Sequence, residues 1–295
     1  MDNNSFSSKI LLFGEYAIMR DSDALSIPFK KFFGFFAKSK DLSADQKISN
    51  SNLEDLYAYL VEKEYLNNNI NLNKLKADID SGLYFRSNIP IGSGLGSSAA
   101  ITSSIIYHYS RVEFDPINLI ELKNIMSLIE SKFHGQSSGF DPLASFFRKP
   151  ILLRSNNAEI IDNISSKNFK IYLLDTGSES STSKMIDLFN KKLVQKNFKN
   201  IFEKSFVNLT NKCIRNFIND SPEFKDSIID LSLSTYNNMG EMIPEYLKDM
   251  WISGLSSEKY FLKLCGSGGG GYFLVFDFDN NLDEYLNKFK LLKVF

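Results

Sequence analysis

Three glycines stand close together in the stretch PIGSGLGSSAA, which runs from Pro90 to Ala100. Glycine accepts a positive φ and has no Cβ, so such a loop either turns tightly or brings its backbone N–H groups close to a ligand. The preceding LYFRSNIP predicts a strand that ends before Pro90, and the following SSAAITSSIIYHY predicts a buried helix. This order aims free N–H groups and the positive end of the helix dipole at one point, where phosphate binds well. The alternative is a plain tight turn, since the loop has neither the lysine of GxxxxGKS nor the spacing of GxGxxG.

The composition limits the classes of protein to which the chain can belong. With 295 residues, 43% of them hydrophobic, the chain can bury a substantial core in one or two domains. Its 34 Lys and Arg against 35 Asp and Glu give a formal charge of −1, so no basic field attracts nucleic acid or an anionic membrane. The two cysteines and two histidines do not have the spacing of a zinc site, and we expect reduced, structural thiols. The N-terminal segment suits neither a signal peptide nor a membrane span, so we expect a cytoplasmic protein.

Hydrophobic periodicity predicts the remaining elements. Apolar residues at helical spacing predict helices over 52–66, over 119–133 and throughout 198–254. Apolar runs over 9–19 and 169–177 predict buried strands. Two further runs, FLKLC and YFLVF, predict strands joined by GSGGGG, a loop that holds more glycine than a hairpin turn needs. We therefore expect another group to approach the backbone of this loop.

Two acidic residues stand near the glycines and hydroxyl residues. Glu130 lies beside the apolar stripe of the 119–133 helix, and the following HGQSSGFDPLAS presents Asp141. Taken alone, Glu130 is a solvated residue at the helix edge, and Asp141, before Pro142, is a turn residue. Two carboxylates beside a phosphate-binding loop suggest metal-assisted phosphate chemistry.

Taken together, three motifs resemble those of the GHMP family of small-molecule kinases and occur in the family's order: KILLFGEYAIM, IPIGSGLGSSAA and KLCGSGGGGYFLVF. The resemblance implies an α+β, two-domain GHMP kinase fold. Residues 1–165 would form the N-terminal ATP-binding domain, similar to ribosomal protein S5 domain 2. Residues 166–295 would form a ferredoxin-like α+β domain that closes over the substrate. The resemblance also makes a homodimer a reasonable assembly.

Within the family, HGQSSGFD is similar to the mevalonate kinase signature HGxPSGxD, and Glu130 stands four residues before His134 as in those enzymes. The resemblance implies ATP-dependent phosphorylation of the 5-hydroxyl of mevalonate, a step of isoprenoid precursor synthesis. Three positions depart from the pattern: Tyr16 replaces the histidine of GEH, Ser137 replaces the proline, and SESSTSK has no counterpart of the family's arginine. GEY also occurs in phosphomevalonate kinases, so a phosphomevalonate kinase or another GHMP kinase is the near alternative. An alternative of another class is a catalytically silent sensor of nucleotide and metabolite.

The resemblance also implies roles for individual residues. Asp141 would be the base, or the group that orients the substrate hydroxyl, and Lys9 would pair with it and stabilise the developing alkoxide. Glu130 and a serine hydroxyl, Ser98 or else Ser97, would bind Mg²⁺. The residues that would hold ATP are Pro90, Gly92, Ser93, Gly94, Leu95, Gly96, Ser97 and Ser98. Those that would contact the substrate are Glu15, Thr182, Gly268 and Gly269.

Overall fold

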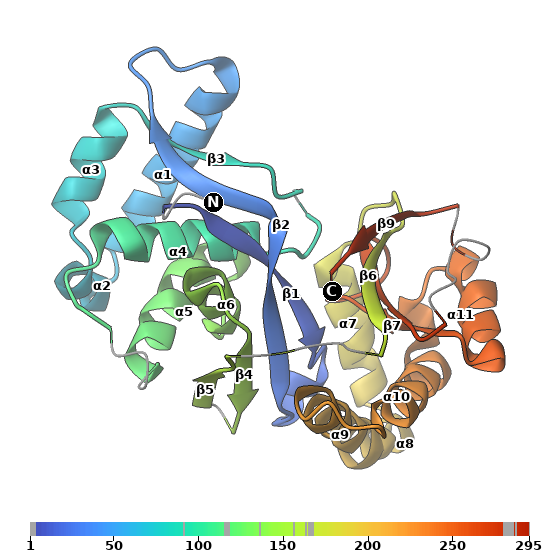
Figure 1. Cartoon of the computed structure of the whole chain (residues 1–295). Helices are drawn as coiled ribbons and strands as arrows, with labels where there is room; N and C mark the ends of the chain where they lie inside the picture. The colour runs from blue at the N-terminus through green and yellow to red at the C-terminus, as the bar shows by residue number, and fades with distance from the viewer. Residues whose placement is uncertain are drawn as a thin grey trace.

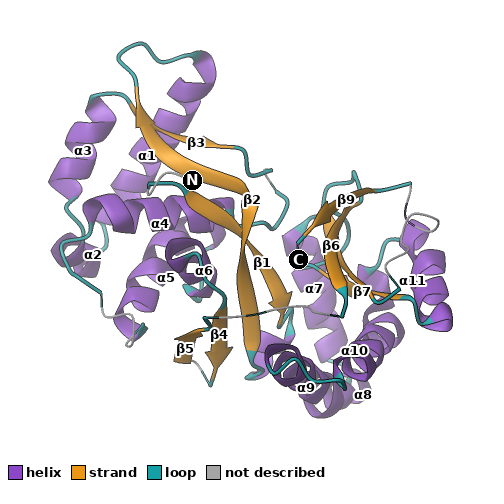
Figure 2. Ribbon diagram, in the orientation of Figure 1, coloured by secondary structure: helices purple, strands orange, loops and turns teal. Residues whose placement is uncertain are grey.

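A computed structural model gives the structure of the protein and describes residues 4–90, 92–114, 119–135, 137–155, 157–162, 164, 168–279, 286 and 288–294. Two β-sheets, each accompanied by helices, form two lobes that lie side by side (Figures 1 and 2). The N-terminal lobe is blue to green in Figure 1, and the C-terminal lobe is yellow to red. The predicted α+β class is therefore confirmed. The predicted domain boundary at 165 and 166 lies outside the described residues and stays a prediction.

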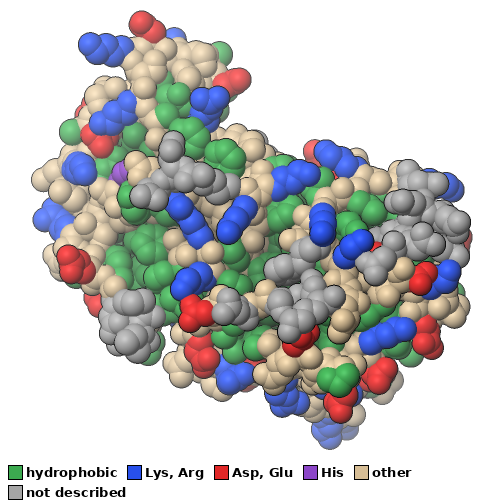
Figure 3. Space-filling model, viewed as in Figure 1, with side chains coloured by type: hydrophobic (Ala, Val, Ile, Leu, Met, Phe, Trp, Pro, Cys, Tyr) green, Lys and Arg blue, Asp and Glu red, His purple; other side chains and the backbone are tan. Residues whose placement is uncertain are grey.

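The sheet of the N-terminal lobe is entirely antiparallel. Its order is β1-β2-β4-β5, and β3 pairs with the other half of the long strand β2. On the face that Figure 3 shows, several basic side chains lie across the middle of the view, and acidic ones lie mostly below them and toward the edges. The strands are β1 (Phe6–Phe13), β2 (Ala24–Lys38), β3 (Leu83–Ser87), β4 (Ile151–Arg154) and β5 (Asn157–Ile160).

Six helices accompany this sheet, and α4 is the most deeply buried of them. Its small side chains let it pack closely against β1, β2, α5 and α6. The Ser103 hydroxyl donates a hydrogen bond to the Pro142 carbonyl of α6 at 3.0 Å, which fixes α6 against α4. The helices are α1 (Ala44–Val61), α2 (Glu64–Asn69), α3 (Leu72–Asp80), α4 (Ser97–Tyr109), α5 (Ile120–His134) and α6 (Phe140–Phe147).

The sheet of the C-terminal lobe has the strand order β7-β8-β6-β9, again entirely antiparallel. In chain order this is 2-3-1-4, the arrangement of a ferredoxin-like sheet, as expected from the sequence. None of the helices in the described part of the chain is long and apolar enough to cross a membrane. The strands are β6 (Lys170–Asp175), β7 (Tyr260–Leu264), β8 (Tyr272–Asp277) and β9 (Lys290–Lys293), and the helices are α7 (Thr182–Leu193), α8 (Lys196–Ile201), α9 (Val207–Ile218), α10 (Phe224–Met239) and α11 (Glu245–Ser257).

Three of the predicted elements have different bounds in the structure. The strand predicted over 9–19 ends at Phe13, because the chain turns and continues as a short 3₁₀ helix, η1 (Ala17–Arg20). The helix predicted over 52–66 begins at Ala44, where Ser43 and Gln46 form a capping box, and is interrupted before α2. The region 198–254 is helical but not continuous: a π turn, η2 (Phe202–Phe206), joins α8 to α9, and η3 (Gly240–Met242) precedes α11.

One hydrophobic core extends across both lobes. The Phe13 ring, at the end of β1, lies 5.7 Å from Phe217, 6.3 Å from Phe224 and 5.8 Å from Phe276 between ring centroids. Aromatic pairs at these distances stabilise the contact beyond the area that they bury. The end of β1 therefore packs against α9, α10 and β8 of the C-terminal lobe.

Candidate active site

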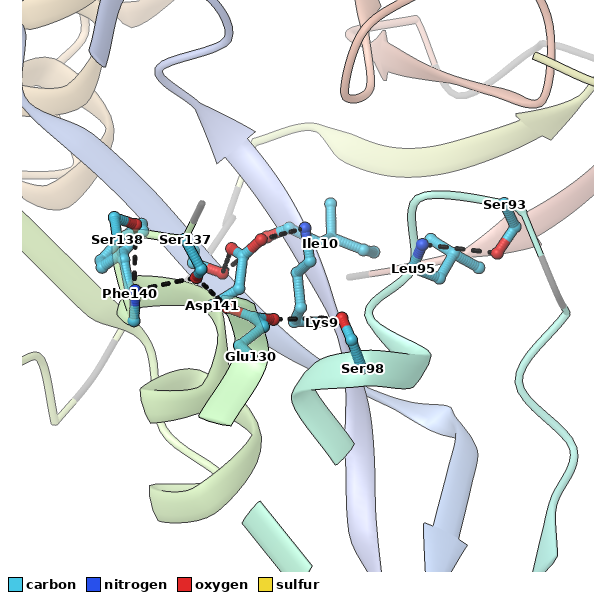
Figure 4. Close-up of polar contacts among 12 residues, drawn as sticks. Lys9, Ile10, Ser93, Leu95, Ser98, Glu130, Ser137, Ser138, Phe140 and Asp141 are labelled. Atoms are coloured by element: carbon cyan, nitrogen blue, oxygen red, sulfur yellow. Dashed lines mark hydrogen bonds and ion pairs between the residues drawn. The ribbon is translucent and has the colours of Figure 1, made fainter. Parts of the chain in front are cut away.

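Lys9 and Asp141 form an ion pair in which Lys9 Nζ lies 2.6 Å from Asp141 Oδ2 (Figure 4). Lys9 is in β1 and only 8% exposed, whereas Asp141 stands in the first turn of α6 with its side chain 32% exposed. Burial lowers the pKa of Lys9, but the charge and hydrogen bond of Asp141 outweigh this effect and raise the pKa above its ordinary value. Lys9 is therefore a fixed positive charge beside a carboxylate that solvent and substrate can reach.

The GSGLG loop (92–96) lies directly against this ion pair. The backbone N–H of Lys9 donates a hydrogen bond to the Leu95 carbonyl at 2.9 Å, so β1 and the loop are joined. Gly96 has a φ of +84°, and a Cβ there would lie 2.7 Å from Lys9 Cγ, so only glycine suits this position. Ser93 shapes the loop internally: its hydroxyl donates to the Pro90 carbonyl at 2.6 Å. Gly92 and Gly94 have open space around them, as a loop that receives a ligand requires.

Glu130 is 4% exposed and lies between two serines. Ser98 Oγ donates to one carboxylate oxygen at 3.1 Å, and Ser137 Oγ donates to the other. Burial, and then the nearby charge of Asp141, raise the pKa of Glu130 to about 7, although both serines and Lys9 act in the opposite direction. A cation bound here would relieve the electrostatic repulsion between the buried Glu130 carboxylate and the nearby Asp141 carboxylate.

The donor atoms at this place fit Mg²⁺, which prefers carboxylate and hydroxyl oxygens. Of the two serines considered from the sequence, Ser98 is the one that contacts Glu130. Within the described residues, no group of three or more His, Cys, Asp and Glu side chains could hold a metal ion. Phosphate oxygens and water would therefore have to complete the coordination, as is usual for Mg²⁺ bound with a nucleotide.

Three glycines of the GSGGGG loop (266–271) are closely approached by other parts of the chain. A Cβ on Gly268 would lie 2.7 Å from the Met242 carbonyl, one on Gly269 2.7 Å from Met185 Sδ, and one on Gly270 2.6 Å from the Glu179 carbonyl. The expected close approach thus comes from η3, α7 and the turn before α7. At its far end the loop reaches the GSGLG loop, since a Cβ on Gly271 would lie 4.0 Å from the Ser93 carbonyl. The substrate contacts expected of Gly268 and Gly269 stay predictions.

The other two predicted substrate residues lie on either side of the GSGGGG loop. Thr182 is the first residue of α7, and Ser267 Oγ lies 3.5 Å from its Oγ1. Glu15 is buried and forms an ion pair with Lys263 of β7. Burial raises the pKa of Glu15, while the charge of Lys263 lowers it. The Glu15 carboxylate therefore joins the two lobes in this structure, and the substrate contact expected of it stays a prediction.

Three residues that organise the site were given no role from the sequence alone. Ser137 contacts Glu130, Lys263 pairs with Glu15, and the Tyr16 hydroxyl donates to the Ser267 carbonyl at 2.7 Å. Lys263 had a visible signal, because it is a lone cation within the apolar strand FLKLC. Ser137 had one as well, because it replaces the proline of the HGxPSG signature.

Part of the N-terminal lobe is similar to a known protein family. A family model described as the GHMP kinases N terminal domain matches residues 55–149, which include the GSGLG loop, Glu130 and Asp141. This part of the chain is therefore similar to the N-terminal domain of GHMP kinases. The mevalonate kinase of Archaeoglobus fulgidus is 25% identical to this chain over 282 residues, covering 90% of this chain and 89% of the relative.

Solved structures show the same fold along almost the whole chain. The mevalonate kinase of Methanococcus jannaschii superposes with a TM-score of 0.66 at 18% identity, covering 98% of this chain and 96% of its own. The phosphomevalonate kinase of Streptococcus pneumoniae, solved with phosphomevalonate and AMPPNP, superposes with a TM-score of 0.64 at 14% identity, covering 98% and 97%. Both substrate classes thus occur on this fold.

Proposed function

We propose that this protein is a GHMP kinase that transfers the γ-phosphoryl group of ATP to the 5-hydroxyl of mevalonate. The observation that carries the proposal is the ion pair of Lys9 and Asp141 against the GSGLG loop, with Glu130 beside it. A phosphoryl transfer needs a positioned hydroxyl, neutralised charge and a phosphate cradle, and these three groups supply them. The curated relative named mevalonate kinase, which matches nine tenths of the chain, supports the choice of alcohol.

In the proposed reaction Asp141 orients the alcohol and accepts its proton as the alcohol oxygen bonds to the γ-phosphorus and the bond to ADP breaks. Lys9 stabilises the negative charge that develops on the alcohol oxygen, and its burial strengthens this effect. The backbone of the GSGLG loop, with Pro90, Ser97 and Ser98, binds the phosphates. Glu130 and Ser98 would hold Mg²⁺, which neutralises phosphate charge when bound. In this proposal residues 1–165 form the ATP-binding domain and residues 166–295 form the C-terminal domain.

The main alternative substrate is 5-phosphomevalonate, which the GEY motif suggests. The structure weakens that argument, because the Tyr16 hydroxyl is bonded to the Ser267 carbonyl and its side chain is buried. A second phosphate near the γ-phosphate of ATP would also need additional cationic donors, most often Arg or Lys. Lys184 is the only such residue in the SESSTSK segment. We therefore favour the unphosphorylated alcohol.

The deciding experiment is an ADP-release assay with purified protein, MgATP and four alcohols: mevalonate, 5-phosphomevalonate, galactose and homoserine. We expect turnover with mevalonate and little with the other three. The Lys9→Met variant is the control, because it removes the charge while leaving a side chain of similar length. A preference for 5-phosphomevalonate would reject mevalonate as the substrate, and nucleotide binding without alcohol-dependent ADP release would favour the catalytically silent sensor.

A further inference from the structure

Ser137 is a residue whose type departs from the family signature and whose contacts depend on that departure. Its hydroxyl donates a hydrogen bond to Glu130 Oε2 and accepts one from the Gly139 N–H at 3.1 Å (Figure 4). Its own backbone N–H donates to Ser131 Oγ at 3.1 Å. Proline has neither a hydroxyl nor an N–H, so it could make none of these contacts.

The backbone of Ser137 is held against α5 from both sides. Ser131 accepts from its N–H, and Ser127 Oγ donates to its carbonyl. Ser127, Glu130 and Ser131 lie three and four residues apart, so they share one face of α5. The segment after α5 is thereby fixed to the same helix face that carries Glu130, and the Ser137 hydroxyl is aimed at the carboxylate.

The two serines at Glu130 have different surroundings. Ser98 is the second residue of α4, the helix that follows the GSGLG loop, and it lies on the opposite side of the carboxylate from Ser137 in Figure 4. An ion bound beside the phosphates would meet Ser98 and Oε1 first. Ser137 would remain as the donor that keeps Oε2, and hence the plane of the carboxylate, in place.

We propose that Ser137 is a positioning residue for a divalent cation: it holds Oε2 of Glu130 so that Oε1 and Ser98 face the metal. This inference rests on the proposed role of Glu130 as a metal ligand. Residues that hold a ligand through a hydrogen bond commonly affect metal affinity about 10–100-fold when they are replaced. Here the ligand is nearly inaccessible to water, so no solvent molecule easily takes the place of the lost donor.

The test measures Mn²⁺ binding by electron paramagnetic resonance, on the whole protein with a non-hydrolysable ATP analogue. Ser137→Ala should weaken Mn²⁺ binding at least about tenfold, and Ser137→Thr, which keeps the hydroxyl, should restore most of the affinity. Ser138→Ala is the matched control, because the Ser138 hydroxyl accepts from the Phe140 N–H at 3.3 Å and belongs to the same segment. It should leave Mn²⁺ affinity unchanged.

Two outcomes would overturn the proposal in distinguishable ways. If Glu130→Gln loses Mn²⁺ affinity while Ser137→Ala retains it, Ser137 only fixes the segment to α5 and the metal role of Glu130 stands. If Glu130→Gln binds Mn²⁺ with the same affinity as the unmodified protein, Glu130 is not a metal ligand and the role of Ser137 is rejected with it. The same conclusion follows if the unmodified protein binds no Mn²⁺. Urea unfolding of each variant identifies any loss of affinity that comes from loss of the fold.

Discussion

Removing only one partner of the buried ion pair between Lys263 and Glu15 should cause an unusually large loss of stability. Both side chains are almost fully enclosed, at 4% and 7% exposure, and they join β7 of one lobe to the end of β1 in the other. Lys263 also donates to the Leu264 carbonyl at 2.8 Å and lies 5.6 Å from the centre of the Phe13 ring. Lys263→Met leaves the Glu15 carboxylate buried without an opposite charge. We expect it to lower the free energy of unfolding by about 3–5 kcal/mol at pH 7.

The size of this loss should depend on pH and on the partner. In Lys263→Met the buried Glu15 carboxylate can become neutral by binding a proton. The free energy of this protonation becomes about 1.4 kcal/mol more favourable for each unit by which the pH is lowered. The variant should therefore recover stability relative to the unmodified protein between pH 8 and pH 5. Replacing both residues, as Lys263→Met with Glu15→Leu, should restore most of the loss, because an apolar pair of similar volume leaves no buried charge.

Urea unfolding followed by circular dichroism measures these differences. The control is Lys149→Met, which breaks the ion pair of Lys149 with Asp162. That pair has a distance of 2.7 Å, but its side chains are 51% and 75% exposed, so its loss should cost less than about 1 kcal/mol. The reasoning is refuted if Lys263→Met is no more destabilising than Lys149→Met, or if the double variant is as unstable as the single one.

Three further predictions concern the site. Asp141→Asn and Lys9→Met should each lower kcat at least about a hundredfold. The double variant should lower kcat little further, because both residues act on one proton. Full activity of either single variant in steady-state kinetics would disprove these roles. Gly96→Ala places a Cβ at a positive φ and against Lys9, so it should lower the free energy of unfolding in urea by at least about 1–2 kcal/mol. Gly94→Ala should lower it less, because a Cβ there would meet open space. Equal losses of stability in the two variants would contradict this expectation. In metal-free protein, Glu130 has a pKa of about 7 when folded and 4.5 ordinarily, so the folded state retains a proton that the unfolded state releases. The free energy of unfolding should therefore fall by at most about 3 kcal/mol as pH rises from 4.5 to 7. In Glu130→Gln, unfolding measured at several pH values should show a smaller dependence on pH. An unchanged dependence would exclude Glu130 as its source.

The sequence by itself determined the features that depend on neighbouring residues. The glycine loop between β3 and α4 was predictable because positive φ values, small residues and a helix start are local properties of the chain. The strands β6, β7 and β8 followed from apolar runs, whereas the α+β class came from the resemblance of the motifs to a family. The roles of Lys9 and Asp141 came from the resemblance of whole motifs to a family, since each residue alone has an ordinary structural explanation.

Only the tertiary structure decided which distant residues meet. Lys263 and Glu15 are 248 positions apart, and Tyr16 and Ser267 are 251 apart. No periodicity or local motif encodes such pairs, because a charge or hydroxyl is buried only where the rest of the fold supplies its partner. The reason for the glycines of the GSGGGG loop was likewise hidden, as Met242, Met185 and Glu179 approach it from other elements. Sequence could show that this backbone needs space, and the packing of the two lobes determined which groups fill it.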